Sequence, residues 1–300
     1  MNKDPIIWVI LKAILFFGFC GLSLWFSSKI VDRFNEKIEP FAYPQRIISL
    51  GPALTEQLYL LGVEDRLVGC TVYCKKPKEA ESKEKVGTII EVNLEKVVDL
   101  KPDLVLATSL TDPKAKEKLK DLGIKVACFP QAKNFSQMCD HFLGLGRLVG
   151  KDKEAKKITN SAKDKVAAIK EKVKNLPKPE VFIQIGAKPL FAATGRSFIN
   201  DFIEFAGGIN MAKEAKEGIY SREEVLKKDP EVIIIVTMGI VGEKEKEIWQ
   251  SYQTLKAVKK GRIYIVDSYQ FCSPTPVSFV EALEEMAGLL HPELYPHQTQ

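Results

Sequence analysis

The chain has 300 residues, of which 45% are hydrophobic and 28% are charged, and its formal net charge is +5. This length is long for one domain and sufficient for two domains, each with its own apolar core. Lysines and acidic residues are interleaved along the chain, and no basic stripe carries the aromatic side chains that a nucleic-acid surface needs, so we expect no nucleic-acid partner.

The first 40 residues contain a hydrophobic segment that predicts export or membrane attachment. Residues 6–26 carry a single charge, and as a helix they would be ~31 Å long, enough to cross a bilayer. We therefore expect a signal peptide or a retained anchor, with residues 41–300 outside the cytoplasm. Cleavage at residues 21–23 and lipidation at Cys20 both stay open, although Phe19 stands where lipoprotein processing expects a small residue.

After residue 40 the apolar pattern alternates between short strands and helices. We expect a first α/β lobe over residues 41–150, with strands at 46–50, 67–72, 103–108 and 124–129 and helices at 55–62, 93–101 and 113–123. The strand at 103–108 has too many consecutive apolar residues for a sheet that is open on one face. Strands separated by helices indicate parallel pairing with helices on both faces of the sheet.

Residues 151–176 predict one long helix that connects two bodies. The segment contains neither Gly nor Pro, and apolar residues recur at helical spacing, namely Ile158, Ala162, Val166, Ile169 and Val173. Pro177 and Pro179 end it. The other faces of this helix are highly charged, which favours a connector over a core element.

The strand and helix alternation then restarts and predicts a second lobe over residues 177–300. We expect strands at 180–186, 230–237 and 261–267 and helices at 197–208, 221–229, 244–258 and 277–290. Ser221 and Glu224 have the spacing of a capping box at the start of one of these helices. The loop "SYQF" at 268–271 follows the last strand.

A short phrase occurs twice, once in each lobe. "NLEKVVDLKPDLV" at 93–105 aligns with "SREEVLKKDPEVI" at 221–233, so that Glu95 matches Glu223 and Pro102 matches Pro230. The match indicates equivalent helix-to-strand units in two lobes of duplicated architecture. Chance similarity is the alternative, because passages of helix, proline, acid and strand are ordinary in α/β proteins.

Residues suited to catalysis or metal binding are scarce. The chain has three histidines, two of them in the tail, and we expect His141 to be a structural or surface residue. The glycines of "GLGRLVG" at 144–150 follow a helical pattern, whereas a dinucleotide fingerprint follows a strand. We therefore expect no catalytic residue, no protein metal site and no intrinsic cofactor.

The sequence does not decide whether the cysteines form a disulfide or stay as free thiols. Cys70 and Cys74 are four positions apart, and Cys128, Cys139 and Cys272 lie elsewhere in the body of the chain. A disulfide is conceivable in an exported protein. Buried apolar thiols are the alternative interpretation.

Several segments resemble a known family. "RIISLGPALTEQLYLLG", "VGCTVYCKKPKEA" and "VNLEKVVDLKPDLVLA" are similar to the amino-terminal lobe of class III substrate-binding proteins of ABC importers, and "VFIQIGAKPLFAATGRSFINDFIEFAGGIN" is similar to the opening of their second lobe. The resemblance covers nearly all of residues 45–290, and among the branches the cobalamin-binding proteins look most similar.

The resemblance implies a fold and a role. The fold would be α/β, with two Rossmann-like lobes whose parallel sheets are joined by one long connecting helix. The chain would capture cobalamin or an iron complex, either a siderophore or haem, in the cleft between the lobes. It would then deliver this ligand to a membrane permease that works with an ATPase.

The resemblance also implies roles for individual residues. Tyr73 stands where these proteins often stack an aromatic ring on the ligand, whereas Ile89 stands where cobalamin binders place a large aromatic ring and therefore departs from their pattern. The other implied ligand contacts are Pro52, Ala53, Phe191, Tyr269 and Gln270. Glu95 and Glu223 fall where the family uses one carboxylate per lobe to dock on arginines of the permease.

Two other functions remain as alternatives. A receptor for a divalent metal would need several histidines and acids that converge on the cleft. An α/β enzyme that uses the cleft would need a nucleophile with its base, or metal ligands. The sequence shows none of these sets.

Overall fold

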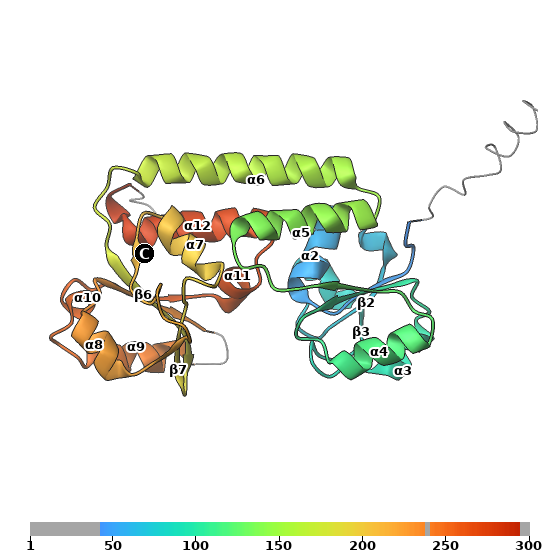
Figure 1. Ribbon diagram of the computed structural model, residues 1–300, viewed down its shortest axis with the longest axis horizontal. Coiled ribbons are helices and arrows are strands. Elements are labelled where there is room, and N and C mark those ends of the chain that lie inside the picture. The colour runs from blue at the N-terminus through green and yellow to red at the C-terminus, as the bar shows by residue number, and fades with distance from the viewer. Residues whose placement is uncertain (1–42, 238–240, 295–300) are drawn as a thin grey trace, which may run out of the picture. The chain divides into compact units, whose positions relative to one another are not determined.

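The computed structural model describes residues 43–237 and 241–294 (Figure 1). The expected signal or anchor segment lies outside the described residues. Within the described part, no helix combines the length and the apolar character that a membrane span requires. Residues Pro44–Gln300 group by their contacts into one compact unit.

The first sheet has five strands, all parallel, in the order β3-β2-β1-β4-β5. Its strands are β1 (Ile47–Ser49), β2 (Leu67–Cys70), β3 (Glu84–Lys85), β4 (Leu104–Thr108) and β5 (Val126–Phe129). All three residues of the central strand β1 are buried, as a strand covered by helices on both faces should be. Helices α2 (Pro52–Leu60), α3 (Leu94–Asp99) and α4 (Pro113–Asp121) belong to this first lobe. The predicted parallel α/β pattern is confirmed here.

The first helix of this lobe begins earlier than the sequence suggested. The predicted helix starts at residue 55, but α2 starts at Pro52 with Gly51 as its N-cap. Proline is tolerated in the first turn because its missing N–H would have no helical partner there. Gly62, with φ of 64°, follows the end of the helix as expected.

The second sheet has six strands and is mixed. It contains β6 (Glu180–Ala187), β7 (Leu190–Ala192), β8 (Ile209–Asn210), β9 (Ile219–Tyr220), β10 (Val232–Val236) and β11 (Ile263–Val266). The strands β8, β10 and β11 continue the parallel pattern around β6, whereas β7 pairs antiparallel with both β6 and β9. The fold class is confirmed, but the sequence did not predict the antiparallel strands, since runs of two or three residues carry no readable period.

The helices of the second lobe are α7 (Ile199–Phe205), α8 (Arg222–Lys228), α9 (Gly242–Gln250), α10 (Lys256–Lys259), α11 (Ser268–Cys272) and α12 (Pro276–Leu290). Short 3₁₀ turns occupy Glu64–Arg66, Lys78–Ser82 and Pro292–Leu294. The capping box of Ser221 and Glu224 is present at the start of α8.

Two predictions in this lobe are wrong. The single helix expected over 244–258 is broken into α9 and α10, because Leu255 is extended and buried and the Asp229 carboxylate accepts a hydrogen bond from Lys256 N at 2.8 Å. The expected loop at 268–271 is helix α11. The Asp267 carboxylate caps this helix by accepting hydrogen bonds from the backbone N–H groups of Tyr269 and Gln270.

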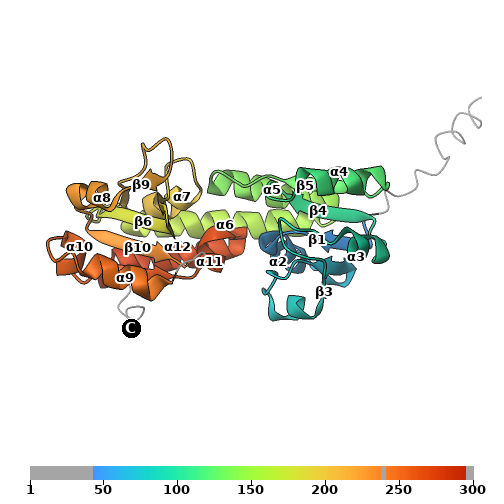
Figure 2. The ribbon, with the colours of Figure 1, turned by 90° about the horizontal axis from the view of Figure 1, so that it is seen from below.

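Helices α5 (Phe135–Leu148) and α6 (Asp152–Val173) run alongside each other and reach both lobes (Figures 1 and 2). A Cβ on Gly146 would clash with that of Ala155, so the glycine of the "GLGRLVG" segment permits the close approach of the two helices. Helix α6 confirms the predicted long connector. Its apolar face also contributes to both cores, from Ala155 in the first to Val173 in the second.

The amino end of α5 is packed into the second core. Phe135 stacks on Phe279 with ring centroids 4.5 Å apart, and Phe279 stacks on Phe202 at 4.3 Å. The backbone N–H of Phe135 donates to the Asp201 carboxylate at 2.7 Å. The amino end of α5 therefore also contacts the second lobe beside the connecting helix α6, and the division of the chain at residue 150 stays a prediction.

Candidate ligand-binding site

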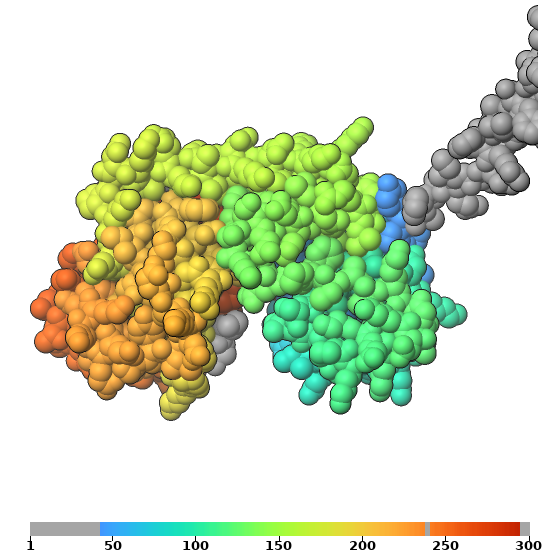
Figure 3. Space-filling model, in the orientation of Figure 1, coloured from blue at the N-terminus to red at the C-terminus, as the bar shows by residue number. Residues whose placement is uncertain are grey.

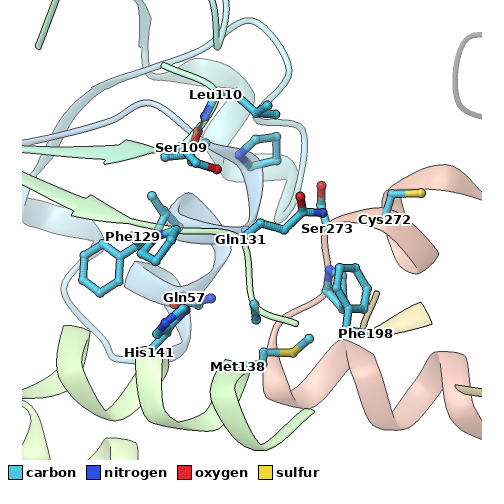
Figure 4. A pocket seen from close by; sticks show the side chains of 18 of the residues that line it. Gln57, Ser109, Leu110, Phe129, Gln131, Met138, His141, Phe198, Cys272 and Ser273 are labelled. Atoms are coloured by element: carbon cyan, nitrogen blue, oxygen red, sulfur yellow. Dashed lines mark hydrogen bonds between the residues drawn. The ribbon is translucent and has the colours of Figure 1, made fainter. Parts of the chain in front are cut away.

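A cavity of about 160 Å³ lies where the carboxyl ends of β1, β4 and β5 face the second lobe. Open α/β sheets generally bind ligands at this edge. The first lobe contributes residues that directly follow these strands: Gly51, Pro52 and Ala53, then Thr108, Ser109 and Leu110, then Phe129, Pro130, Gln131 and Ala132. Phe198, Cys272, Ser273 and Pro274 line the cavity from the second lobe (Figure 4).

Most of the lining is apolar, but a few polar groups point into it. Gln57, on α2, is 5% exposed, and its Oε1 has no hydrogen-bond partner within the described residues. Gln57 and His141 lie at one end of the cavity, whereas Gln131 extends toward Ser273 at the other (Figure 4). A ligand that donates a hydrogen bond could satisfy the buried oxygen of Gln57.

His141 was expected to be a structural or surface residue, and the structure places it in the wall of the cavity. It projects from α5, and its ring meets that of Phe129 edge-on at 6.4 Å between centroids. Ser109 and Gln131 were also missed. The rule that ligands bind after the carboxyl ends of parallel strands would have found these two residues, but not His141, which lies within a helix.

The predicted ligand contacts divide into two groups. Pro52, Ala53 and Ile89 line the cavity. Tyr73 and Phe191 lie outside it and are 51% and 37% exposed. The structure therefore brings Pro52, Ala53 and Ile89 together at the cavity, and leaves the two aromatic side chains with accessible rings.

Tyr269 and Gln270 lie on α11, directly before the lining residues Cys272 and Ser273. Lys76 of the first lobe places its ammonium group 5.0 Å from the centre of the Tyr269 ring. Burial raises the pKa of the Tyr269 hydroxyl, so this side chain stays neutral at physiological pH. Tyr269 therefore forms part of a contact between the lobes beside the cavity.

Exposed apolar side chains follow three strands of the first sheet. They are Val72 and Tyr73 after β2, Ile90 after β3 and Leu110 after β4. In the second lobe, exposed Phe191 pairs with exposed Ile219 across β7 and β9. Figure 3 shows the surface hollowed between the two lobes. Clustered exposed apolar residues beside a cavity are typical of a binding surface.

Glu56 forms a second contact between the lobes. Thr275 Oγ1 donates to the Glu56 carboxylate at 3.2 Å. Burial is the main cause of the raised pKa of Glu56, and Glu281 adds to it, while the hydrogen bonds from Thr275 and Ser278 and the charge of Lys76 oppose it. The charged form of this carboxyl group is therefore disfavoured in the folded protein.

We expect Glu56→Gln to melt at a higher temperature than the wild type near pH 7. A group whose pKa is raised by folding stabilises the fold below its ordinary value of 4.5 and loses that contribution as pH rises through the folded value. The advantage of the variant should therefore shrink as pH falls toward about 4. Melting curves across this range test the expectation, with exposed Glu79→Gln as the control. A lower melting temperature near pH 7 would show that the attraction to Lys76 and Thr275 outweighs the cost of burial.

Glu95 and Glu223 are both exposed, and each is the second residue of a short helix, α3 or α8. Within residues 43–237 and 241–294, neither carboxylate has a hydrogen-bond or ion-pair partner. Helices α3 and α8 lie on the side away from α6, one on each lobe (Figure 1). Both carboxylates are therefore free to meet another molecule.

The backbone around the two glutamates supports equivalent units. Asn93 caps α3 by accepting from the N–H three residues on, and Ser221 caps α8 in the same way. Lys101 and Asp229 are the two non-glycine residues with positive φ within the described residues, at 46° and 52°. Each directly precedes the matched proline, where a left-handed conformation is uncommon for a non-glycine residue.

The strands that follow are joined to the sheets in the same way. Asp103 N donates to Arg46 O at 2.9 Å, and Glu231 N donates to Glu180 O at 2.9 Å. The strand β4 pairs with β1 and β5, just as β10 pairs with β6 and β11. The two phrases are therefore structural equivalents, and local chance is a weaker explanation of their similarity.

Among the residues that the structure describes, no candidate metal site accompanies the cavity. Across the described ranges, no group of three or more His, Cys, Asp and Glu side chains could hold a metal ion. His291 is buried in the second lobe, where its ring nitrogen Nε2 lies 2.9 Å from Ala206 O. The geometry therefore suits reversible binding of a solute.

Comparisons with known proteins agree with this geometry. Residues 47–270 match the family described as periplasmic binding protein. A Bacillus subtilis protein described as an uncharacterized ABC transporter substrate-binding lipoprotein, YvrC, is 33% identical over 278 residues, covering 90% of this chain and 87% of the relative. A vitamin B12-binding protein of Vibrio vulnificus is 28% identical over 246 residues, covering 81% of this chain and 88% of the relative.

A solved structure has the same fold. The crystal structure of a possible iron-binding, periplasmic solute-binding protein from Staphylococcus epidermidis superposes with a TM-score of 0.75 at 30% identity, covering 83% of this chain and 99% of that one. The chain therefore belongs to the periplasmic binding protein family, as a substrate-binding component of an ABC importer and not as an enzyme.

Proposed function

We propose that the chain captures cobalamin or a ferric chelate, either a siderophore or haem, between its lobes and delivers it to an ABC permease with its ATPase. The observation that carries the proposal is the apolar cavity at the carboxyl ends of β1, β4 and β5, with exposed Val72, Tyr73, Ile90 and Leu110 on strand ends nearby. Relatives named for vitamin B12 and for iron favour the same ligand classes.

The size of the cavity decides how such a ligand would sit. A volume of about 160 Å³ is below the roughly 300–1,000 Å³ of sites that enclose a drug-sized molecule. A corrin, a porphyrin or a siderophore complex would therefore place only part of its surface in the cavity. The remainder would rest on exposed apolar side chains, which is the role we propose for Tyr73 and Phe191.

The residue at position 89 bears on the choice among these ligands. Ile89 lines the cavity, but an aliphatic side chain cannot stack on a macrocycle as an aromatic ring does. The contacts proposed for Pro52, Ala53, Tyr269 and Gln270 do not discriminate among cobalamin, siderophores and haem either. The proposal therefore names a class of metal chelates, and a titration has to choose within it.

We expect one member of a panel of cobalamin, ferric siderophores and haem to bind the purified protein with a Kd below roughly 10 μM. Tyr73→Ala should raise the Kd of that ligand by roughly 10- to 100-fold, because full burial of a large apolar side chain contributes about 1–3 kcal/mol. Fluorescence quenching or calorimetry measures both values. Leu122→Ala, which removes an exposed apolar side chain at the end of α4, is the control. The assignment fails if no panel member binds, or if Tyr73→Ala binds as tightly as the wild type.

A receptor for a free divalent metal is the second candidate, and the structure favours it less. Such a site needs several converging oxygen, nitrogen or sulfur ligands. In the part of the chain that the structure describes, no cluster of three such residues exists. The metal is therefore proposed to arrive already chelated.

We further propose that residues 41–300 lie outside the cytoplasm, secreted or tethered by the amino-terminal segment. The apolar run at 6–26 supports this, as does the description of the Bacillus subtilis relative as a lipoprotein. Protease added to intact cells with a permeable outer layer should degrade the body of the protein while a cytoplasmic marker survives. Full protection of the body, or its recovery in the cytosolic fraction, would contradict the proposal.

Glu95 and Glu223 are proposed to dock the loaded protein on its permease. Their exposure, their lack of partners among the described residues and their equivalent places on two lobes support this role.

A further inference from the structure

A buried pair of thiols lies beside the exposed Tyr73 loop and has no part in the proposed function. Cys70 ends strand β2, and Cys74 follows a turn in which its backbone N–H donates to Thr71 O at 3.1 Å. Both side chains are 0% exposed and both are free thiols. Cys70 therefore directly precedes this tight turn and Cys74 ends it, and Cys70 Sγ donates to Ala80 O at 3.7 Å.

Polar groups converge on this sulfur pair. Thr55 Oγ1 donates to Cys74 Sγ at 3.1 Å, and Thr71 Oγ1 lies 3.2 Å from the same sulfur. Lys85 Nζ donates to Cys70 Sγ at 3.3 Å and is held in place by Ala80 O at 2.8 Å. A buried thiol that serves only as a small apolar side chain needs no such donors.

The surroundings favour one thiolate in the pair. The neighbouring Cys70 side chain is the main cause of the lowered pKa of Cys74. The hydroxyls of Thr55 and Thr71 lower it further, while burial opposes them. Cys139 offers a contrast within the same chain. It is also 0% exposed, but burial raises the pKa of its thiol to about 11. Thiolates are the reactive form of cysteine in exchange with disulfides.

We propose that Cys70 and Cys74 are a redox-active dithiol that forms an internal disulfide by exchange with a small-molecule disulfide. The burial of both thiols at one turn and the converging donors carry the proposal, which holds whichever solute the cleft binds. The oxidising surroundings of an extracytoplasmic protein suit such a bond.

The exchange proceeds in two steps. The Cys74 thiolate attacks one sulfur of a small disulfide, forms a mixed disulfide and releases one thiolate, which takes up a proton from solvent. Cys70 then loses its proton to solvent and attacks Cys74 Sγ, so that the Cys70–Cys74 bond forms and the second small thiolate leaves and takes up a proton from solvent. The two protein thiols are oxidised, and the small disulfide is reduced to two thiols.

The bond would close a short loop that carries Val72 and Tyr73. Both sulfurs are buried, so exchange requires this loop to open, and its residues Val72 and Tyr73 are exposed. Once formed, the disulfide restricts the unfolded chain. We therefore expect oxidation to raise the melting temperature of the full-length protein by a few degrees, and a reductant to reverse the rise.

Mass spectrometry gives a direct test on the full-length chain in detergent. Trypsin cuts after Arg66 and Lys75, so residues 67–75 form one peptide that holds both cysteines and no other. After exposure to oxidised glutathione, unfolding and alkylation, this peptide should be about 2 Da lighter than its reduced, unalkylated form and carry no alkyl group. The Cys139 peptide should be alkylated as before, and dithiothreitol should restore double alkylation of the 67–75 peptide.

Three results would overturn the proposal: double alkylation of the peptide after oxidation, a stable glutathione adduct on one cysteine, or a bond from either cysteine to another peptide. Lys85→Gln tests the role of the cation. Because Lys85 supports negative charge on the pair, we expect this variant to oxidise several-fold more slowly and to reach the same product. An unchanged rate would remove Lys85 from the mechanism.

Discussion

Glu95→Arg and Glu223→Arg should each lower ligand uptake by roughly 10-fold or more while ligand affinity in solution stays at the wild-type value. The expected size follows from charge pairs desolvated at an interface, where truncation of one partner costs about 2–5 kcal/mol. Radiolabelled ligand uptake into whole cells measures the first quantity. Titration of the purified variants measures the second.

The physical argument for a shared partner comes from symmetry. A carboxylate near a helix amino terminus gains only about 0.3–1 kcal/mol from the helix dipole, which explains either glutamate alone. It does not explain why Glu95 and Glu223 recur in units that also share caps, left-handed pre-proline residues and strand pairing. A two-fold symmetric permease with a basic cluster on each half would engage both carboxylates at once.

The chain offers matched controls for this experiment. Glu117 on α4 and Glu247 on α9 are also exposed helical glutamates of the first and second lobes, and neither is at an equivalent position. Glu117→Arg and Glu247→Arg change the net charge by the same amount, so they test whether general electrostatics explains a loss of uptake. We expect near-normal uptake from both controls.

A different outcome would count against docking. If Glu95→Arg or Glu223→Arg lost ligand affinity or thermal stability in proportion to uptake, the glutamate would have a local role in the fold. Equal losses in the control variants would point to nonspecific attraction between the protein and the membrane.

The fold could be predicted from the sequence where patterns are long and buried. The run 232–236 reads as a buried strand, and all five of its residues are buried in β10. The spacing of Ala162, Val166 and Ile169 predicts a helix, and these residues form the buried face of α6. Hydrophobic periodicity reports these elements because each of them buries a defined face.

Other features depend on contacts between distant segments. The strands β7 and β9 are too short for a period, and each is fixed by its partner, β7 by β6 and β9 by the more distant β7. The packing of Phe135 against Phe279 joins α5 to the second core, although these residues are far apart in sequence. No local pattern in either segment could reveal that contact.

The candidate site was predictable only in part for a similar reason. Pro52 and Ala53 follow a strand and line the cavity as expected. Gln57 and His141 lie within helices, so their direction toward the cavity depends on how α2 and α5 pack in the core of the first lobe. That packing depends on both helices and on the sheet, and not on either local sequence alone.

A second large effect, on stability, is expected from the network of side chains at the amino end of helix α8. Arg222, at the first position of α8 beside Glu223, places its Nη2 2.6 Å from the Glu245 carboxylate. Gln184 Nε2 donates to the same carboxylate at 2.7 Å, and Trp249 Nε1 donates to Gln184 Oε1 at 2.7 Å. Gln184 and Trp249 are fully buried, and Glu245 nearly so.

We expect Arg222→Met to destabilise the protein by about 3–5 kcal/mol, because it leaves the buried Glu245 carboxylate without its cation. For a protein of this size, the melting temperature should fall by roughly 6 °C or more. The guanidinium carbon of Arg222 also lies 4.6 Å from the centre of the Trp249 ring, so the loss includes this cation–π contact. Thermal unfolding followed by far-ultraviolet circular dichroism measures it.

The double variant Arg222→Met with Glu245→Gln separates a stranded charge from lost packing. The amide oxygen at position 245 could still accept from Gln184, and no net charge would stay buried, so we expect the double variant to recover more than half of the loss. Lys96→Met is the exposed control. Its ion pair with Glu84 is 3.8 Å long and more than half exposed on both sides, so its removal should cost less than about 1 kcal/mol. A double variant as unstable as Arg222→Met would assign the loss to packing against Trp249. The network would then stabilise the amino end of α8, and with it Glu223, by packing rather than by charge pairing.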